Sequence, residues 1–166
     1  ALIQKTSYQE IDATVDVYAP EGPDVNDFLN KIEGYNNRTK NPTNWIVKTH
    51  LSEDYLEKMI TEKPGNVMVV SGKNSKKIDY ILAAVNSGLN VYADKPLVVD
   101  LEGFKKLEKV FEIAKEKNLM VYDIMTERFE VTTGIQKALS MKPEVFGTLL
   151  DGSPSEPSIS KESIHH

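Results

Sequence analysis

The sequence of 166 residues contains 40% apolar and 27% charged residues, the balance of an ordinary globular protein with a hydrophobic core. Its net charge is −5 and its Lys and Arg residues are scattered, which argues against a nucleic-acid partner. No apolar run approaches the ~20 residues needed to cross a bilayer, and the absence of cysteine excludes disulfides, thiolate metal sites and a Cys nucleophile. We therefore expect a cytoplasmic protein without a membrane partner.

The first third of the chain alternates between helical and extended patterns. Residues 1–9 are expected to end a helix whose start lies outside the sequence. Residues 11–19 are rich in Val, Ile and Tyr and predict a strand, which a Pro/Gly-rich turn ends. Asp24 is expected to cap a short helix, residues 34–44 to form a polar loop, and residues 45–50 to form a second strand.

The central third repeats this alternation. Ser52 is expected to cap a helix that a Pro-Gly pair ends, and residues 66–70 form a nearly all-apolar run of the kind buried in parallel sheets. A helix is predicted over residues 75–86, with Gly88 placed to end it, and residues 91–93 predict the next strand.

The last third continues the pattern and then becomes polar. Asp100 is expected to cap a long helix, and a strand-like run follows over residues 119–124. We expect a further helix over 126–140, a strand over 146–150, and a Ser/Pro-rich loop or tail over 151–166 that ends in two histidines. The buried stripe of the helix after Asp100 is predicted to comprise Leu101, Phe104, Leu107, Phe111 and Ala114.

Alternation of strands and helices along the whole chain predicts the α/β fold class, with a doubly wound parallel sheet covered by helices on both faces. The boundaries that we expect are a first domain over residues 1–125, then a connecting helix and first strand of a second, α+β domain over 126–150. Residues 151–166 follow as a tail.

The stretch 66–99 carries the most specific pattern. An apolar strand leads into a loop containing Asn74, a helix ending in Ala84-Val85, a turn at Gly88, and a short strand ending in Asp94-Lys95-Pro96-Leu97. In these features the sequence resembles the glucose–fructose oxidoreductase/inositol dehydrogenase (Gfo/Idh/MocA) family. Arg128-Phe129 is similar to the pair that opens the helix leading to that family's substrate domain, and residues 146–149 to the start of that domain. The resemblance covers roughly residues 1–150 and implies an NAD(P)-binding Rossmann fold.

The sequence also departs from the family pattern. Gly72-Lys73 replaces the family's Thr-Pro, Lys77 stands where a His is common, and Asp94 replaces a Glu. The first strand, with its Gly-rich turn, and most of the substrate domain lie outside the sequence. That strand would occupy the centre of the sheet, and each unpaired ladder group left buried beside its place costs ~1–3 kcal/mol. We therefore expect the strand to be supplied from outside this sequence, or another segment to fill its place.

Two predicted loops carry the candidate site. Ser71, Gly72 and Asn74 follow one strand, while Asp94, Lys95 and Pro96 follow the next, and ligands of open parallel sheets bind at the carboxyl ends of strands. The resemblance implies that these residues line the nicotinamide-ribose side of a cofactor. The alternative for the first loop is an ordinary turn and helix cap, which Ser and Asn form routinely.

Lys95 is the residue that we expect to be catalytic. A lysine beside a reacting hydroxyl can bind and orient the substrate, and it can stabilise the negative charge that develops on oxygen. Pro96 would fix the backbone after it, and Asp94 could pair with Lys95 or accept a hydrogen bond from neighbouring backbone. A solvated lysine at a strand end is the alternative.

The remaining candidates concern cofactor choice, substrate and metal. An acid after the second strand of such a domain contacts the adenosine ribose in NAD enzymes, and Glu21 or Asp24 could fill that place. Because no Arg follows that strand closely, we expect NAD or NADP, with NAD favoured. Arg128 is either a substrate ligand or an exposed surface residue. His50 is isolated in the sequence and is read as a surface residue, and no metal site is predicted.

These observations predict a nicotinamide-dependent oxidoreductase that transfers a hydride between NAD(P) and a sugar or polyol hydroxyl or ketone. The fragment alone is expected to be inactive, because the family's base lies in the absent domain, through which a homo-oligomer would also form. One alternative is an NAD-dependent glycosidase of the same family, which cleaves by transient oxidation and re-reduction. The other is a catalytically inactive cofactor-binding or interaction domain.

Overall fold

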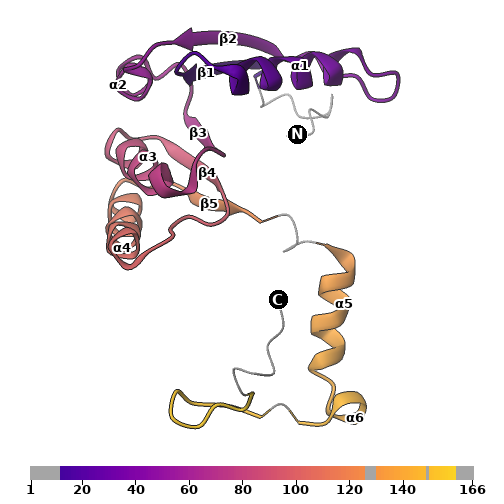
Figure 1. Ribbon diagram of the computed structural model, residues 1–166. Coiled ribbons are helices and arrows are strands. Elements are labelled where there is room, and N and C mark those ends of the chain that lie inside the picture. Colours follow the sequence, from indigo (N-terminus) through magenta and orange to yellow (C-terminus); the bar gives the residue numbers. More distant parts are fainter. Residues whose placement is uncertain (1–11, 126–129, 149, 160–166) are drawn as a thin grey trace. The chain divides into compact units, whose positions relative to one another are not determined.

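The computed structural model describes residues 12–125, 130–148 and 150–159. The chain divides into two compact units, Ala1–Ile124 and Met125–His166. The first unit contains parallel strands joined by helices, so its fold class is α/β, as predicted (Figure 1). No helix among the described residues combines the length and apolar character that crossing a membrane requires.

A two-stranded parallel sheet opens the first unit. It consists of β1 (Thr14–Ala19) and β2 (Ile46–Leu51), with Thr14 opposite Ile46. The side chain of Asp12 accepts a hydrogen bond from the Thr14 backbone N–H at 2.7 Å, at the point where β1 begins. The predicted strand therefore starts a few residues later than expected, and Ile11 lies outside the described residues.

Helix α1 (Pro23–Asn37) connects these strands and is longer than predicted. Gly22 occupies the N-cap and Pro23 the first turn, where its missing N–H is not needed, so Asp24 lies inside the first turn and is not the cap. Residues 34–37 are helical rather than part of the polar loop. The Asn36 side chain then organises that loop, because its Oδ1 accepts from Thr43 Oγ1 at 2.7 Å and from the Trp45 backbone N–H at 2.9 Å.

Helix α2 (Tyr55–Glu62) begins later than its predicted cap. Asp54 is the N-cap residue, so the expectation that Ser52 caps this helix is wrong. The buried Ser52 Oγ has no hydrogen-bond partner within the described parts of the chain. Lys63 ends the helix in the left-handed conformation, with φ of 40°, and its N–H donates to the Met59 carbonyl at 2.9 Å.

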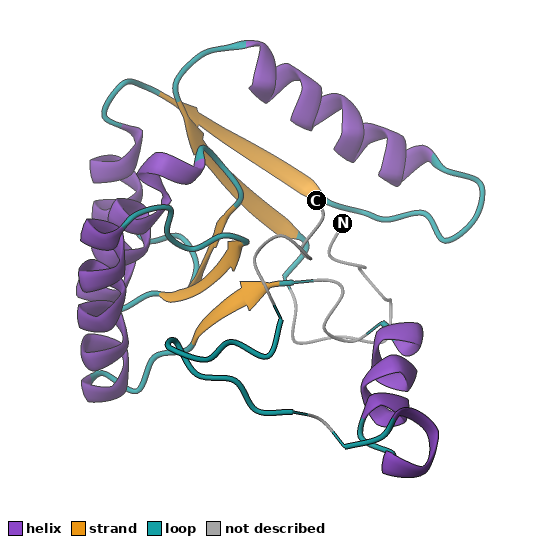
Figure 2. Ribbon diagram, turned by 60° about the horizontal axis from the view of Figure 1, so that its bottom comes forward, coloured by secondary structure: helices purple, strands orange, loops and turns teal. Residues whose placement is uncertain are grey.

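A three-stranded parallel sheet, ordered β3-β4-β5, forms the rest of the first unit. Its strands are β3 (Val67–Val70), β4 (Asn90–Asp94) and β5 (Val121–Ile124). Helices α3 (Asn74–Asn86) and α4 (Leu101–Glu116) pack side by side on one face of this sheet (Figures 1 and 2). Gly88, with φ of 83°, follows α3 in the left-handed conformation, as predicted.

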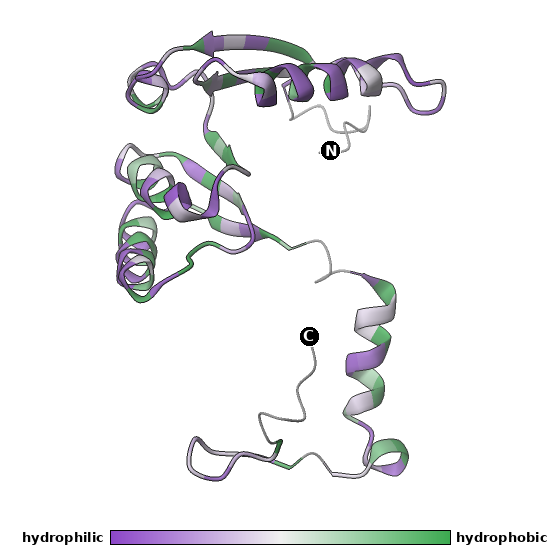
Figure 3. Ribbon diagram, in the orientation of Figure 1, coloured by the Kyte–Doolittle hydropathy of each residue, from purple (hydrophilic) through white to green (hydrophobic). Residues whose placement is uncertain are grey.

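The hydrophobic core lies between this sheet and its two helices. Ile81, Val85, Val91 and Val110 are fully buried there, and the hydropathy colouring shows the apolar strand β3 (Figure 3). The other buried members are Val70, Ile78, Ala84, Leu89 and Ala93.

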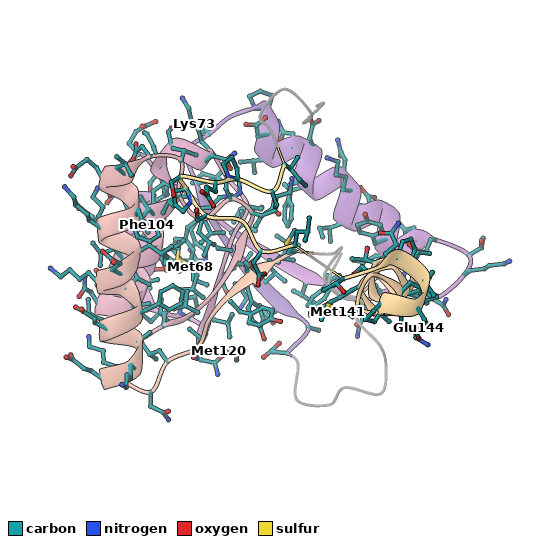
Figure 4. All side chains as sticks on the ribbon, turned by 90° about the horizontal axis from the view of Figure 1, so that it is seen from below. Met68, Lys73, Phe104, Met120, Met141 and Glu144 are labelled. Atoms are coloured by element: carbon teal, nitrogen blue, oxygen red, sulfur yellow. The ribbon has the colours of Figure 1, made fainter. Side chains whose placement is uncertain are left out.

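The buried face of α4 differs from the predicted stripe. Val110 and Ala114 are buried and Leu107 is partly buried against the core, whereas Leu101, Phe104 and Phe111 are exposed. Figure 4 labels Phe104, whose side chain is 52% exposed. The helix carries two neighbouring apolar stripes, and the one with small and β-branched residues lies against α3 and the sheet.

The sheet is interrupted between β1 and β3. Among the described residues, β1 pairs only with β2, and β3 pairs only with β4. Within this described part of the chain, each of the two strands therefore has one edge whose backbone N–H and C=O groups lack a ladder partner. This interruption falls where the sequence predicts a central strand from outside the chain, and the origin of that strand stays a prediction.

The second unit contains α5 (Val131–Ser140) and α6 (Pro143–Phe146). Glu130 caps α5 by accepting from the Thr133 backbone N–H at 2.9 Å, so the helix begins later than residue 126. The predicted strand over 146–150 is wrong, because Phe146 ends α6 and Gly147 follows with φ of 75°. Met141 and Glu144, labelled in Figure 4, belong to this unit.

Candidate functional site

The carboxyl ends of β3 and β4 lie at one edge of the three-stranded sheet. The two strands are parallel and in register, with Val70 opposite Ala93, so Ser71 and Asp94 follow at the same end. This places the two loops predicted to form the site next to each other. Ser71 and Gly72 are exposed in the loop after β3, Asn74 is exposed at the start of α3, and Lys73 between them is labelled in Figure 4.

The buried ammonium of Lys77 joins the first turn of α3 to the end of β4. Its Nζ donates to Asn74 Oδ1 at 2.9 Å, within α3, and to the backbone carbonyl of Asp94 at 2.7 Å, at the end of β4. Lys77 is only 1% exposed, although lysine is almost never fully buried in proteins. Nothing in the sequence predicts this link beyond the position of Lys77 on the same helical face as Ile81 and Ala84.

The Asn74 side chain does not cap its helix. Lys73 occupies the N-cap of α3, and no side-chain capping hydrogen bond is formed there. An ammonium can only donate, so the oxygen of the Asn74 amide must face Lys77. The amide nitrogen, which is a donor, therefore lies on the side of the Asn74 amide that is turned away from Lys77.

The Asp94–Pro96 segment follows β4 directly. Asp94 Oδ1 accepts a hydrogen bond from the Lys95 backbone N–H at 2.9 Å, which is one of the two contacts expected for this carboxylate. The peptide bond between Lys95 and Pro96 is cis, and both residues are exposed. Lys95 thus follows the sheet edge that Ser71 and Asn74 also follow.

The other predicted site residues lie elsewhere. Glu21 is exposed in the turn after β1, at the carboxyl end of the two-stranded sheet. In the loop after β3, by contrast, a Cβ added at Gly72 would have no protein atom within 4 Å, so the space beside this glycine is open. Arg128 lies outside the described residues.

An open groove of about 550 Å³ lies between the first turns of α2 and α3. The hydroxyls of Tyr55 and Tyr80 are 2.6 Å apart in its lining, and burial followed by this hydrogen bond raises the pKa of Tyr80 to about 12. Tyr80 is partly buried and packs against the hydrophobic core, so the groove adjoins the core. The full lining comprises Glu53, Asp54, Tyr55, Leu56, Glu57, Lys76, Asp79 and Tyr80. None of the predicted site residues belongs to it.

A second polar cluster joins β1, β2 and α2. His50 Nε2 lies 2.8 Å from Asp16 Oδ1, and the His50 ring stacks on Tyr18 with centroids 4.3 Å apart. The Tyr18 hydroxyl donates to Glu62 at 2.6 Å, and burial is the main cause of its raised pKa. His50 is therefore not an isolated surface residue. No three or more His, Cys, Asp and Glu side chains in the described ranges are arranged to hold a metal ion.

Comparisons with known proteins agree with this fold. Residues 135–166 match the family model described as "Putative oxidoreductase C terminal domain". The crystal structure of a protein from Parabacteroides merdae ATCC 43184, described as a "putative oxidoreductase", is 51% identical, with a TM-score of 0.86 over 95% of this chain. The chain spans 36% of that protein's length. No curated protein matches the sequence.

Two further solved structures share the fold at low identity. The WlbA dehydrogenase of Bordetella pertussis, solved with NADH and UDP-GlcNAcA, is 12% identical, with a TM-score of 0.52 over 77% of this chain and 33% of its own. Biliverdin reductase of Synechocystis sp. PCC 6803, solved with biliverdin and NADP+, is 14% identical, with the same TM-score of 0.52 over 77% of this chain and 43% of its own. The chain therefore has the α/β fold of these cofactor-containing proteins.

Proposed function

We propose that this chain forms the cofactor-binding part of an oxidoreductase that transfers a hydride between NAD or NADP and a hydroxyl or ketone of a sugar or polyol. The proposal is supported by the 51% identical relative described as an oxidoreductase. The observation that carries it is the pair of segments after β3 and β4 at the carboxyl edge of a parallel sheet, where Lys77 links the start of α3 to the end of β4.

The residues at this edge fit a nicotinamide nucleoside. The Asn74 amide offers a hydrogen-bond donor, and the open space beside Gly72 lets a ligand approach the backbone closely. A bound nicotinamide would supply the hydride acceptor or donor. Ser71 adds a hydroxyl from the same loop, and Asp94 and Pro96 flank Lys95 on the neighbouring one.

Lys95 would act on the substrate oxygen. The Lys95 side chain is long and the residue is exposed, so its ammonium could bind a hydroxyl brought to this edge. Its charge would stabilise the substrate oxygen as the proton leaves. Asp94 Oδ1 accepts a hydrogen bond from the Lys95 backbone N–H at 2.9 Å, which fixes the backbone from which the Lys95 side chain extends. Arg128 remains our second candidate for binding the substrate.

We expect NAD rather than NADP. Glu21 follows β1 as an exposed carboxylate, suited to a ribose hydroxyl and repelling a 2′-phosphate. The expected partners are a small sugar or polyol and further copies of the protein, with no nucleic acid.

The test compares Lys95→Met with Lys109→Met in the full-length protein. Lys109 is an exposed lysine on α4, distant in sequence from both loops. We expect turnover on a panel of sugars and polyols, followed by nicotinamide absorbance, to fall about 10²–10³-fold in the Lys95 variant only. NADH binding, followed by nicotinamide fluorescence, should change little in either variant.

Three outcomes would contradict the proposal. If Lys95→Met turned over substrate as fast as Lys109→Met, Lys95 would not be catalytic. Release of free sugar without net NADH would indicate a glycosidase that oxidises only transiently. Tight NADH binding without turnover on any substrate would indicate a cofactor-binding domain without catalysis.

A further inference from the structure

We infer that Lys77 is a positioning residue, which orients the Asn74 amide so that its NH₂ group points to the ligand and which holds the peptide preceding Lys95. The inference rests on the proposed function and extends it, because it assigns a hydrogen-bonding direction to the site. The ligand atom at Asn74 must then be an acceptor, such as an uncharged oxygen of the nicotinamide nucleoside.

Burial of the Lys77 ammonium is unfavourable in free energy, and a purely structural role does not require a charge at this position. An ammonium that is 1% exposed has lost its hydration, and both of its acceptors are neutral oxygens. It also lies near the N-terminal end of α3, where the helix dipole disfavours a cation. An apolar side chain of similar length would avoid these costs at this place beside Ile78 and Ile81.

The Lys77 ammonium can donate hydrogen bonds to Asn74 and to the Asp94 carbonyl at the same time. A side-chain amide can turn either end towards a neighbour, since its oxygen and nitrogen are nearly the same size. The Lys77 donor removes this freedom for Asn74, and its second bond fixes the Asp94 carbonyl 2.7 Å away. One charged group that does not reach the surface thereby holds Asn74, at the start of α3, and the Asp94 carbonyl, which directly precedes Lys95.

The decisive variant is Asn74→Asp. An aspartate at position 74 keeps an oxygen for Lys77 and gives the buried ammonium a carboxylate partner, so the fold should be retained or strengthened. The same change replaces the NH₂ donor by an acceptor. We expect thermal unfolding at or above the wild-type temperature, together with NADH binding weakened about tenfold or more. Wild-type NADH affinity in this variant would overturn the assigned direction.

A double-mutant cycle tests the link itself. Lys77→Met should weaken NADH binding about tenfold, and adding it to Asn74→Ala should weaken binding no further, because it acts through Asn74. A loss that arose from general destabilisation would instead add to the Asn74 effect. Lys109→Met, on the exposed face of α4, serves as the control and should leave binding unchanged.

The same cycle measured by urea unfolding without cofactor separates this inference from the proposed function. Non-additive effects of Lys77→Met and Asn74→Ala on the unfolding midpoint would support the link even if the wild-type protein bound no nicotinamide cofactor, in which case only the proposed function would fail. Additive effects would overturn the link whatever the protein binds.

Discussion

Replacing Asp100 by Ala should destabilise the first unit through a defined contact. Asp100 precedes α4, and its Oδ1 accepts a hydrogen bond from the Gly103 backbone N–H at 2.6 Å. Loss of such an N-cap costs about 1 kcal/mol, and loss of the carboxylate from the positive end of the helix adds about 0.3–1 kcal/mol. We therefore expect Asp100→Ala to reduce the free energy of unfolding by about 1–2 kcal/mol.

Asp100→Asn separates the two contributions. Asparagine caps helices as well as aspartate does, so this variant should lose only the charge contribution, at most about 1 kcal/mol. The assay is urea unfolding of the full-length protein followed by circular dichroism, comparing midpoints at unchanged slope. Equal losses in the two variants would show that the cap hydrogen bond contributes nothing, and an unchanged midpoint in Asp100→Ala would refute the reasoning altogether.

Three further predictions concern the core, the groove and cofactor choice. Ile81→Ala should cost about 2–5 kcal/mol of unfolding free energy and Ile81→Val about 0.5–1.5, because Ile81 is 0% exposed; equal urea midpoints would contradict its packing role. Since the pKa of Tyr80 is raised from 10.0 to about 12, the stability that its neutral hydroxyl provides is present below pH 10 and lost towards pH 12. Unfolding midpoints of Tyr80→Phe should therefore fall less over this range than those of the wild type. Glu21→Ser should improve NADPH affinity relative to NADH, measured by fluorescence titration, and an unchanged ratio would exclude Glu21 from the ribose site.

The order of strands and helices was predictable because each element of the first unit has a clear local pattern. The all-apolar run that became β3, the Asp100 cap of α4 and the glycine after α3 were all predicted correctly. The buried face of α4 was not, because Phe104 and Val110 lie on adjacent apolar stripes and only packing against α3 selects between them. The strand expected over 146–150 was wrong, because a short apolar run does not exclude a helix that ends at Phe146 and is followed by Gly147.

The sequence could predict that the two candidate segments lie at one sheet edge, but it could not predict the contacts between them. The places of Asn74 and Lys95 follow from parallel strands that end at one edge, which a single sequence can indicate. The burial of Lys77 does not follow, because lysine in a sequence predicts exposure and only the folded arrangement supplies its two acceptors. The contacts of His50 with Asp16 and Tyr18 likewise join residues from different strands, which no local pattern reveals.

The interruption between β1 and β3 has a consequence for how the backbone exchanges its hydrogens with solvent. Strand β4 is bonded to a neighbour on both sides, so its amides should remain protonated longest in deuterated water. Within the described residues, strands β1 and β3 each have ladder bonds on one side only, so their outward amides should take up deuterium at the earliest time points whenever the expected central strand is not in place. Among the described strands, the slowest to exchange should thus be the one that leads directly into Lys95, so the proposed catalytic lysine would follow the strand that opens last.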